Sequence, residues 1–336
     1  MDLARLAIRH GDYHDLLRRK DLDLIVNASY SHQHAETTVE ALSAGYHVLC
    51  EKPMALNVAE ADRMIEAGKK SGKVLAVFQQ SRFSPAFREM KRVMESGVLG
   101  RVTLIKIMFN AFSRRWDWQT AQKYGGGNLM NTGPHPLDQA ISLFGKVKPR
   151  VVCFMDRTDN TYGDAEDYVR VILSGEGKPV IEVEISSCCA YPTGMYQVQG
   201  TRGGLKGTAN ELEWKYYVAE EAPGQKLLMD PLSKPDGTPA YCGEELKWHE
   251  GKWSWNDQVN AKSGTAYNNA ANDLMSVKGP QASVDLFSHM AACYYGMLHA
   301  TLTEGKPLEV TLEQVRQQMA IFEECRRQNP HVYAKS

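Results

Sequence analysis

The most constraining feature of the sequence is an alternation of short apolar runs with helical segments in its first hundred residues. Leu22–Ser29, His47–Cys50 and Lys73–Gln80 have the length and composition of buried strands. Between them, Ala35–Gly45 and Val58–Gly72 have the spacing of amphipathic helices that end at glycines. Strands that alternate with helices predict right-handed crossovers and a parallel sheet covered by helices.

The pattern changes after residue 100. Several apolar runs, some of them strictly alternating, follow one another with one clear helix among them, at Pro134–Phe144. Such runs predict a mostly antiparallel sheet, and two further helices close the chain, the second of them capped by Thr311. We therefore expect an α/β domain over residues 1–100 and an α+β domain over residues 101–336.

Composition and charge narrow the class of partner. The chain has 336 residues and a formal net charge of -1, and it contains no long block of Lys or Arg. We therefore expect neither nucleic acid nor a membrane as partner, and a small molecule is the better expectation. The seven cysteines are scattered and lack C-x-x-C spacing, and we find no signal-peptide pattern and no bilayer-length apolar run. These features predict a cytoplasmic protein with free thiols.

Two polar loops follow predicted parallel strands. "SYSHQHAE", residues 29–36, comes after the first strand, and "EKPMA", residues 51–55, comes after the second. In open parallel sheets ligands bind beyond the carboxyl ends of the strands. Both loops should therefore lie on one rim, where Glu51 and Lys52 face a ligand crevice.

The sequence resembles a known family at these motifs. "SHQHAETTVEALSAGYHVLCEKP" together with "YGGGNLMNTGPHPLDQAISLFG" is similar to the glucose-fructose oxidoreductase/inositol dehydrogenase (Gfo/Idh/MocA) family. The resemblance implies a Rossmann-type parallel sheet followed by a large open-faced, mostly antiparallel sheet. It also implies NAD or NADP as cofactor, a secondary alcohol of a sugar, inositol or glycoside as substrate, and a homo-oligomer such as a dimer or tetramer.

The family's functional residues map onto the matching positions of this chain. Lys52 matches the lysine beside the substrate hydroxyl and the nicotinamide, and Pro53 matches the proline of that turn, where a cis peptide bond is expected. His135 matches the general base, and Asp138 matches the acidic residue that closes its motif. Asn131 is a departure, because the family commonly has Asp there. The cofactor-binding residues implied by this match are Ser29, His34, Glu51, Lys52 and Pro53.

The chemistry of the reaction suits these side chains. Transfer of a hydride between a secondary alcohol and nicotinamide needs a base for the hydroxyl proton and a positive group for the developing alkoxide. His135 suits the first task and Lys52 the second. Asn131 can orient either residue, but unlike Asp it cannot stabilise an imidazolium. Since Pro134 and Pro136 clash with a regular helix, we expect the helix that carries His135 to begin near Pro134 or to be kinked there.

Substrate contacts are expected in the loop at residues 112–127. Arg114, Arg115 and Trp116 combine hydrogen-bonding forks with a flat apolar face, which suits a sugar; the alternative is a packed lid or an oligomer contact. Asp138 and Tyr191 are further substrate candidates, although Asp138 could simply favour a helix dipole. His32 and His34 have no Cys or carboxylate at recognisable spacing, so no metal site is expected.

One expected motif is missing from the sequence. A Rossmann half begins with strand, G-x-G-x-x-G and helix, and the printed chain contains no such motif. We expect that the first strands of the domain are absent, through a missed upstream start or true loss, and the choice between NAD and NADP stays open. "TRGGLKGT", residues 201–208, is interpreted as a hairpin. Two other functions remain possible: a catalytically silent carbohydrate-binding or scaffold protein, and a lyase or epimerase that recycles its cofactor.

Overall fold

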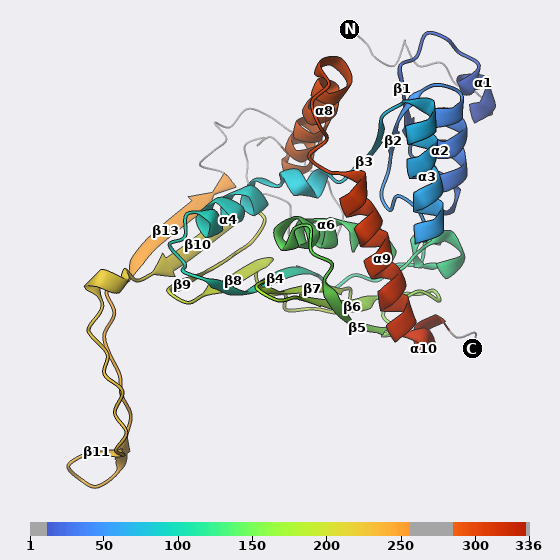
Figure 1. The fold of residues 1–336 in the computed structure, drawn as a ribbon. Helices are drawn as coiled ribbons and strands as arrows, with labels where there is room; N and C mark the ends of the chain where they lie inside the picture. The colour runs from blue at the N-terminus through green and yellow to red at the C-terminus, as the bar shows by residue number, and fades with distance from the viewer. Residues whose placement is uncertain (1–11, 256–284, 334–336) are drawn as a thin grey trace.

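The protein consists of two sheets joined by helices. The computed structural model describes residues 12–255 and 285–333. In Figure 1 the small sheet lies with α2 and α3 at one end of the molecule, and the large sheet lies below the remaining helices. This arrangement confirms the expected fold class, a Rossmann-type parallel sheet followed by a large, mostly antiparallel sheet.

The first sheet is parallel, as the alternating pattern predicted. Its order is β1-β2-β3, and β2 pairs with both neighbours. Gly72 ends the second of the two covering helices in the left-handed region, with φ of 65°. The elements are β1 (Leu24–Asn27), α2 (His34–Ser43), β2 (His47–Cys50), α3 (Val58–Ser71) and β3 (Leu75–Val77), preceded by α1 (Tyr13–Leu17).

The second sheet has eight strands in the order β13-β10-β9-β8-β4-β7-β6-β5. All its neighbouring pairs are antiparallel except β4 with β7. The strands β8 and β9 form the hairpin expected around residues 201–208. The strands are β4 (Val102–Asn110), β5 (Arg150–Asp156), β6 (Tyr168–Ser174), β7 (Val180–Ser186), β8 (Tyr196–Gly200), β9 (Gly203–Gly207), β10 (Glu211–Tyr216) and β13 (His249–Ser254).

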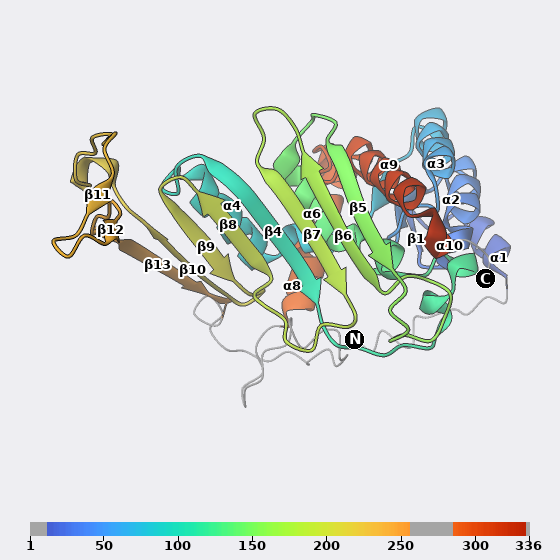
Figure 2. The ribbon, with the colours of Figure 1, turned by 90° about the horizontal axis from the view of Figure 1, so that it is seen from below.

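Helices cover one face of the large sheet. Alternating residues such as Val169, Val171 and Leu173 of β6 are fully buried on this face. The opposite face is free of helices in the described part of the chain, as the view from below shows (Figure 2). The helices are α4 (Pro85–Glu95), α5 (Asn128–Asn131), α6 (Pro134–Phe144), α8 (Leu286–Glu304), α9 (Leu312–Gln328) and α10 (Pro330–Tyr333), with short 3-10 turns at η2 (Ser31–Gln33), η3 (Gln80–Phe83), η4 (Trp118–Thr120), η5 (Gln122–Tyr124) and η6 (Ala219–Glu221).

The closing helices tie the two sheets together. The Tyr294 hydroxyl of α8 donates to the Val77 carbonyl at the end of β3, at 2.6 Å. Helix α9 begins with the predicted Thr311 cap, whose partner in the capping box is Gln314, and packs against both α3 and β5. Within the described ranges, no helix combines the length and apolar character needed to cross a membrane.

A narrow ribbon leaves the large sheet between β10 and β13. It contains β11 (Leu232–Ser233) paired with β12 (Pro239–Ala240). Figure 1 shows it projecting far from the body of the molecule. The prolines and glycines of this segment hide the strand pattern in the sequence.

Candidate active site

The E-K-P turn opens into a cavity between the two sheets. Strand β2 is buried to its last residue, Cys50, so the chain leaves the core at Glu51. The Lys52–Pro53 peptide bond is cis, as expected. Glu51 and Lys52 line a cavity of about 700 Å³ whose other walls come from the large sheet, the loop at residues 111–119, α5, α6 and α8.

Lys52 is held in the cavity wall by a hydrogen bond to the backbone. Its Nζ donates to the backbone carbonyl oxygen of Asn131 at 2.8 Å. Burial lowers the pKa of Lys52 to about 8, an effect that the neighbouring Glu51 carboxylate opposes and the Arg115 charge reinforces. Burial in turn raises the pKa of Glu51. Lys52 is therefore a cation that can lose its proton near neutral pH.

A break between two helices places Asn131 and His135 on the same cavity. Helix α5 ends at Asn131 and α6 begins at Pro134, which confirms the expected start near that proline. Gly133 lies in the break, where a Cβ atom would come within 2.2 Å of the Leu129 carbonyl oxygen. Only glycine fits this close approach, so the backbone turns sharply and both side chains line the cavity.

His135 presents an unpaired nitrogen. Its Nδ1 is buried and has no hydrogen-bond partner among the described residues. Burial and the Lys52 charge hold the pKa of His135 well below its usual range, so the imidazole is neutral near pH 7. Buried polar atoms are rarely left unpaired, because each costs roughly 1–3 kcal/mol. A neutral ring with a free nitrogen is prepared to accept a proton or a hydrogen bond from a ligand.

The predicted substrate loop reaches the cavity. Arg114, Arg115 and Trp116 all line it. Arg115 is paired with Asp117 at 2.8 Å and also contacts Gln119, which fixes its guanidinium. The Trp116 side chain is 78% exposed and leaves its flat face free. The loop therefore places three groups at the cavity wall: the fixed guanidinium of Arg115, the guanidinium of Arg114 and the exposed indole ring of Trp116.

A smaller cavity of about 160 Å³ adjoins the first. It is lined by Ser29, His34 and Pro53, and it shares Glu51, Lys52, Gln119 and Asn131 with the large cavity. A ligand can thus extend from the β1–α2 loop into the space between the sheets.

His34 fastens the two loops rather than leaving a nitrogen free. Its Nδ1 lies 2.7 Å from the Pro53 carbonyl oxygen and its Nε2 lies 3.0 Å from the Ser29 carbonyl oxygen. The ring is 1% exposed, and burial lowers its pKa. His34 lines the small cavity, but both of its ring nitrogens already lie against backbone carbonyl oxygens.

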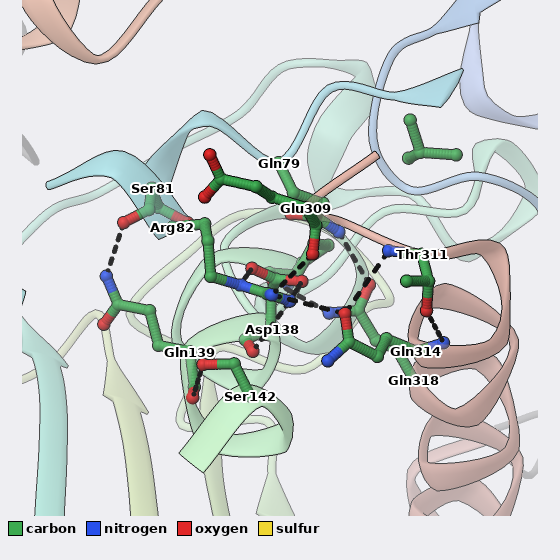
Figure 3. Close-up of polar contacts among 12 residues, drawn as sticks. Gln79, Ser81, Arg82, Asp138, Gln139, Ser142, Glu309, Thr311, Gln314 and Gln318 are labelled. Carbon is green, nitrogen blue, oxygen red and sulfur yellow. Dashed lines mark hydrogen bonds and ion pairs between the residues drawn. The ribbon is translucent and has the colours of Figure 1, made fainter. Parts of the chain in front are cut away.

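Two predicted substrate residues lie away from the cavity. Asp138 is 2% exposed and forms a two-pronged ion pair with Arg82, with distances of 2.7 and 2.5 Å. Arg82 also donates to Gln314 of α9 (Figure 3). Tyr191 is 94% exposed and is not among the lining residues. The structure therefore brings neither side chain to the space where a substrate would sit.

Several lining residues were missed by the sequence analysis. Gln119 lines both cavities, and Phe287 and Met290 reach the large one from α8, far along the chain. An apolar helix gives no signal of such a role. Asn128, by contrast, follows three consecutive glycines, and a Cβ atom at Gly127 would lie 2.4 Å from Glu166, so the motif itself could have indicated a crowded, functional turn. Within the described ranges, no three His, Cys, Asp or Glu residues are grouped so that they could hold a metal ion.

Comparison with known proteins agrees with this architecture. The chain has a parallel-sheet half and an open-sheet half, and each half matches one family model. Residues 7–79 match the family described as "Oxidoreductase family, NAD-binding Rossmann fold", and residues 87–206 match the "GFO/IDH/MocA C-terminal domain". The two matches together cover more than half of the chain, which belongs to the Gfo/Idh/MocA family.

Similar proteins include enzymes of known substrate. The chain is 26% identical over 202 residues to inositol 2-dehydrogenase of Salmonella typhimurium, covering 60% of this chain and 57% of that protein. It is 29% identical over 198 residues to trans-1,2-dihydrobenzene-1,2-diol dehydrogenase of Mus musculus, covering 58% and 57%. The chain therefore spans little more than half the length of the curated relatives it matches.

A solved structure shares the fold over nearly the whole chain. The WlbA dehydrogenase from Bordetella pertussis, in complex with NADH and UDP-GlcNAcA, superposes with a TM-score of 0.67. The match covers 98% of this chain and 84% of that one at 21% sequence identity. At that identity the likeness concerns the fold alone.

Proposed function

We propose that this protein is an NAD(P)-dependent oxidoreductase that interconverts a secondary alcohol and a ketone on a sugar, inositol or glycoside. The observation that carries the proposal is the pairing of Lys52 with a neutral His135 on one cavity, where the Nδ1 of His135 is buried without a partner. Each group fits one requirement of alcohol oxidation. The hydroxyl proton needs an acceptor, and the oxygen that loses it needs a nearby positive charge.

Different residues of the chain would carry out the separate steps of the alcohol oxidation. His135 accepts a hydrogen bond from the substrate hydroxyl at Nδ1 and then its proton. Lys52 stabilises the negative charge that develops on that oxygen, while its bond to the Asn131 carbonyl fixes its position. Ser29, Glu51 and Pro53 border the space for the nicotinamide end, and the bound dinucleotide would supply the redox chemistry. Asn131, unlike an aspartate, adds no charge to stabilise the imidazolium.

The substrate class rests on the cavity wall and on the relatives. The free face of Trp116 suits the apolar face of a sugar ring, and Arg114 suits its hydroxyls or an anionic substituent. Relatives whose names specify a substrate act on an inositol and on a dihydrodiol. A structural neighbour holds NADH together with a nucleotide sugar. All of these are compounds that carry vicinal hydroxyls or a sugar.

Turnover with a panel of substrates tests the proposal. The purified protein is incubated with NAD or NADP and with inositols, sugars or glycosides, and nicotinamide reduction is followed by fluorescence. We expect reduction with at least one substrate and its loss in Lys52→Met, while Lys91→Met, which changes a lysine on the outer side of α4, has full activity. Substantial activity in Lys52→Met would refute the assignment of Lys52. Cofactor binding without any reduction, together with tight sugar binding, would instead favour the binding-protein function.

A further inference from the structure

The ribbon between β10 and β13 forms an arm, which we define as residues 222–248. Its two sides are joined to each other by β11–β12 pairing, by a bond from Gln225 to Glu244 at 2.9 Å and by the turn at Lys234–Thr238. No residue from 223 to 247 is buried. The arm is thus a ribbon that the described body of the chain leaves uncovered between residues 223 and 247.

Apolar side chains are concentrated on the arm. Leu227 is 82% exposed, Met229 is 83% exposed and Tyr241 is 91% exposed, and Leu228 and Leu232 are also exposed. Scattered exposed apolar residues are ordinary, but a cluster on one projecting ribbon marks a contact surface. The arm extends away from the described body of the chain, where a second molecule can bury these side chains (Figure 1).

The direction of the arm indicates where that molecule lies. The arm leaves the edge of the large sheet toward the side opposite the helices (Figure 1), and the sheet face on that side carries no described helix (Figure 2). At the root of the arm lies a groove of about 570 Å³, whose lining includes Lys206, Lys215 and Trp248. A body packed on the open face would therefore lie beside the arm.

Charge on the open face favours a second copy of this chain. Positive and negative side chains alternate across neighbouring strands, and several already pair, as Arg170 and Lys106 do with Glu182. A face with both signs in nearly equal number can pair with itself across a two-fold axis, whereas a partner of another kind would be recognised by an excess of one sign. The charged strand residues of this face are Lys106, Arg150, Arg170, Lys206, Lys215 and Lys252, and Asp156, Glu182, Glu184, Glu211, Glu213 and Glu250.

We propose that the arm clasps a second copy of the chain, so that in the dimer each arm packs Leu227, Met229 and Tyr241 against the other copy's open-sheet side. The family resemblance implied a homo-oligomer but no contact made by this arm. The arm adds a reciprocal contact that does not depend on the proposed enzymatic activity.

Sedimentation equilibrium of the purified full chain tests the proposal. We compare wild type with Leu227→Asp/Met229→Asp, and use Leu227→Met/Met229→Leu as the matched apolar control. We expect a dimeric wild type and control, and a dissociation constant raised at least about tenfold in the aspartate variant, because buried apolar anchors dominate such contacts. The Tm of the monomer should not change, since the side chains of Leu227 and Met229 are more than 80% exposed in the single chain.

Two results would overturn the proposal. One is a wild-type chain that stays monomeric up to concentrations of about 100 μM, where even weak specific dimers form. The other is an aspartate variant whose dissociation constant differs from that of wild type by less than about tenfold, which would show that the arm is not part of the interface.

Discussion

His135 and Asp138 lie within one turn of each other on helix α6, but their side chains have opposite surroundings. His135 faces the cavity with Nδ1 unpaired, and its pKa lies well below the usual range. Asp138 points to the interior, where both carboxylate oxygens pair with Arg82 (Figure 3). Burial raises the pKa of Asp138, and the Arg82 charge works against this rise. One helix thus carries a histidine with an unpaired ring nitrogen and an aspartate whose two carboxylate oxygens are both hydrogen-bonded.

This difference distinguishes a side chain that stabilises the fold, Asp138, from one whose polar atom is open to a ligand, His135. The Arg82–Asp138 pair joins η3 to α6, and Arg82 continues to Gln314 at the start of α9. It therefore fixes the junction on which the cavity is built, whereas His135 adds no stabilising contact through Nδ1. A titratable residue in a family motif belongs to the reacting site only if its polar atoms are still available.

The largest expected effect comes from removing the unpaired group. His135→Asn should lower turnover roughly 10²- to 10⁴-fold, because a positioned general base contributes about that much. The free energy of unfolding should change by less than about 1 kcal/mol, since Nδ1 makes no bond to lose. Steady-state kinetics and urea unfolding on the same preparation measure both. A variant that loses stability but keeps activity would reverse the comparison.

Breaking the Arg82–Asp138 ion pair should mainly lower the free energy of unfolding. Arg82→Met leaves a buried, unpaired Asp138 carboxylate and should reduce the free energy of unfolding by roughly 3–5 kcal/mol. The loss should shrink as pH falls, because the protonated carboxyl carries no charge to bury. Urea unfolding at several pH values measures this. Arg82→Met/Asp138→Leu is the control and should recover much of the stability; an equally unstable double variant would show that the charge is not the cause.

A shift of the pH profile should follow from changes around Lys52. If its charged form stabilises the alkoxide, turnover should fall as pH rises through about 8. Glu51→Gln removes a charge that raises the Lys52 pKa and should move this fall to lower pH, whereas Asn131→Asp adds such a charge and should move it to higher pH. The pH dependence of kcat measures both shifts. Identical profiles in all three proteins would contradict the role given to Lys52.

The smallest effect distinguishes two aromatic residues of the sequence analysis. Trp116→Ala should raise KM several-fold with little change in kcat, since a stacked ring is worth about 0.5–1.5 kcal/mol. Tyr191→Ala should change neither constant, because that ring lies outside the cavity. Equal effects of the two substitutions in steady-state kinetics would mean that the substrate extends beyond the cavity.

The sequence predicted those features that depend on local pattern. Apolar runs placed the strands of both sheets, and the prolines at 134 and 136 predicted the break that aims His135 at the cavity. The position of Lys52 followed from the rule that ligands bind beyond parallel strands, and the family motif named its chemistry.

Features that depend on distant partners could not be predicted. Arg82 lies 56 residues before Asp138, so nothing local indicated that the carboxylate is already paired. The two carbonyl contacts of His34 likewise depend on how two loops meet. The arm lacks both strand and helix periodicity over most of its length, and its β11–β12 pairing appears only in three dimensions.

The central proposal is that a dinucleotide binds with its nicotinamide end in the small cavity, which Lys52 shares with the large cavity that His135 lines. Equilibrium binding of NADH and NADPH to the purified chain, followed by nicotinamide fluorescence, tests it most directly. The account predicts saturable binding of at least one of them in the micromolar to low millimolar range, as is usual for such ligands. The absence of binding of both throughout that range would contradict it.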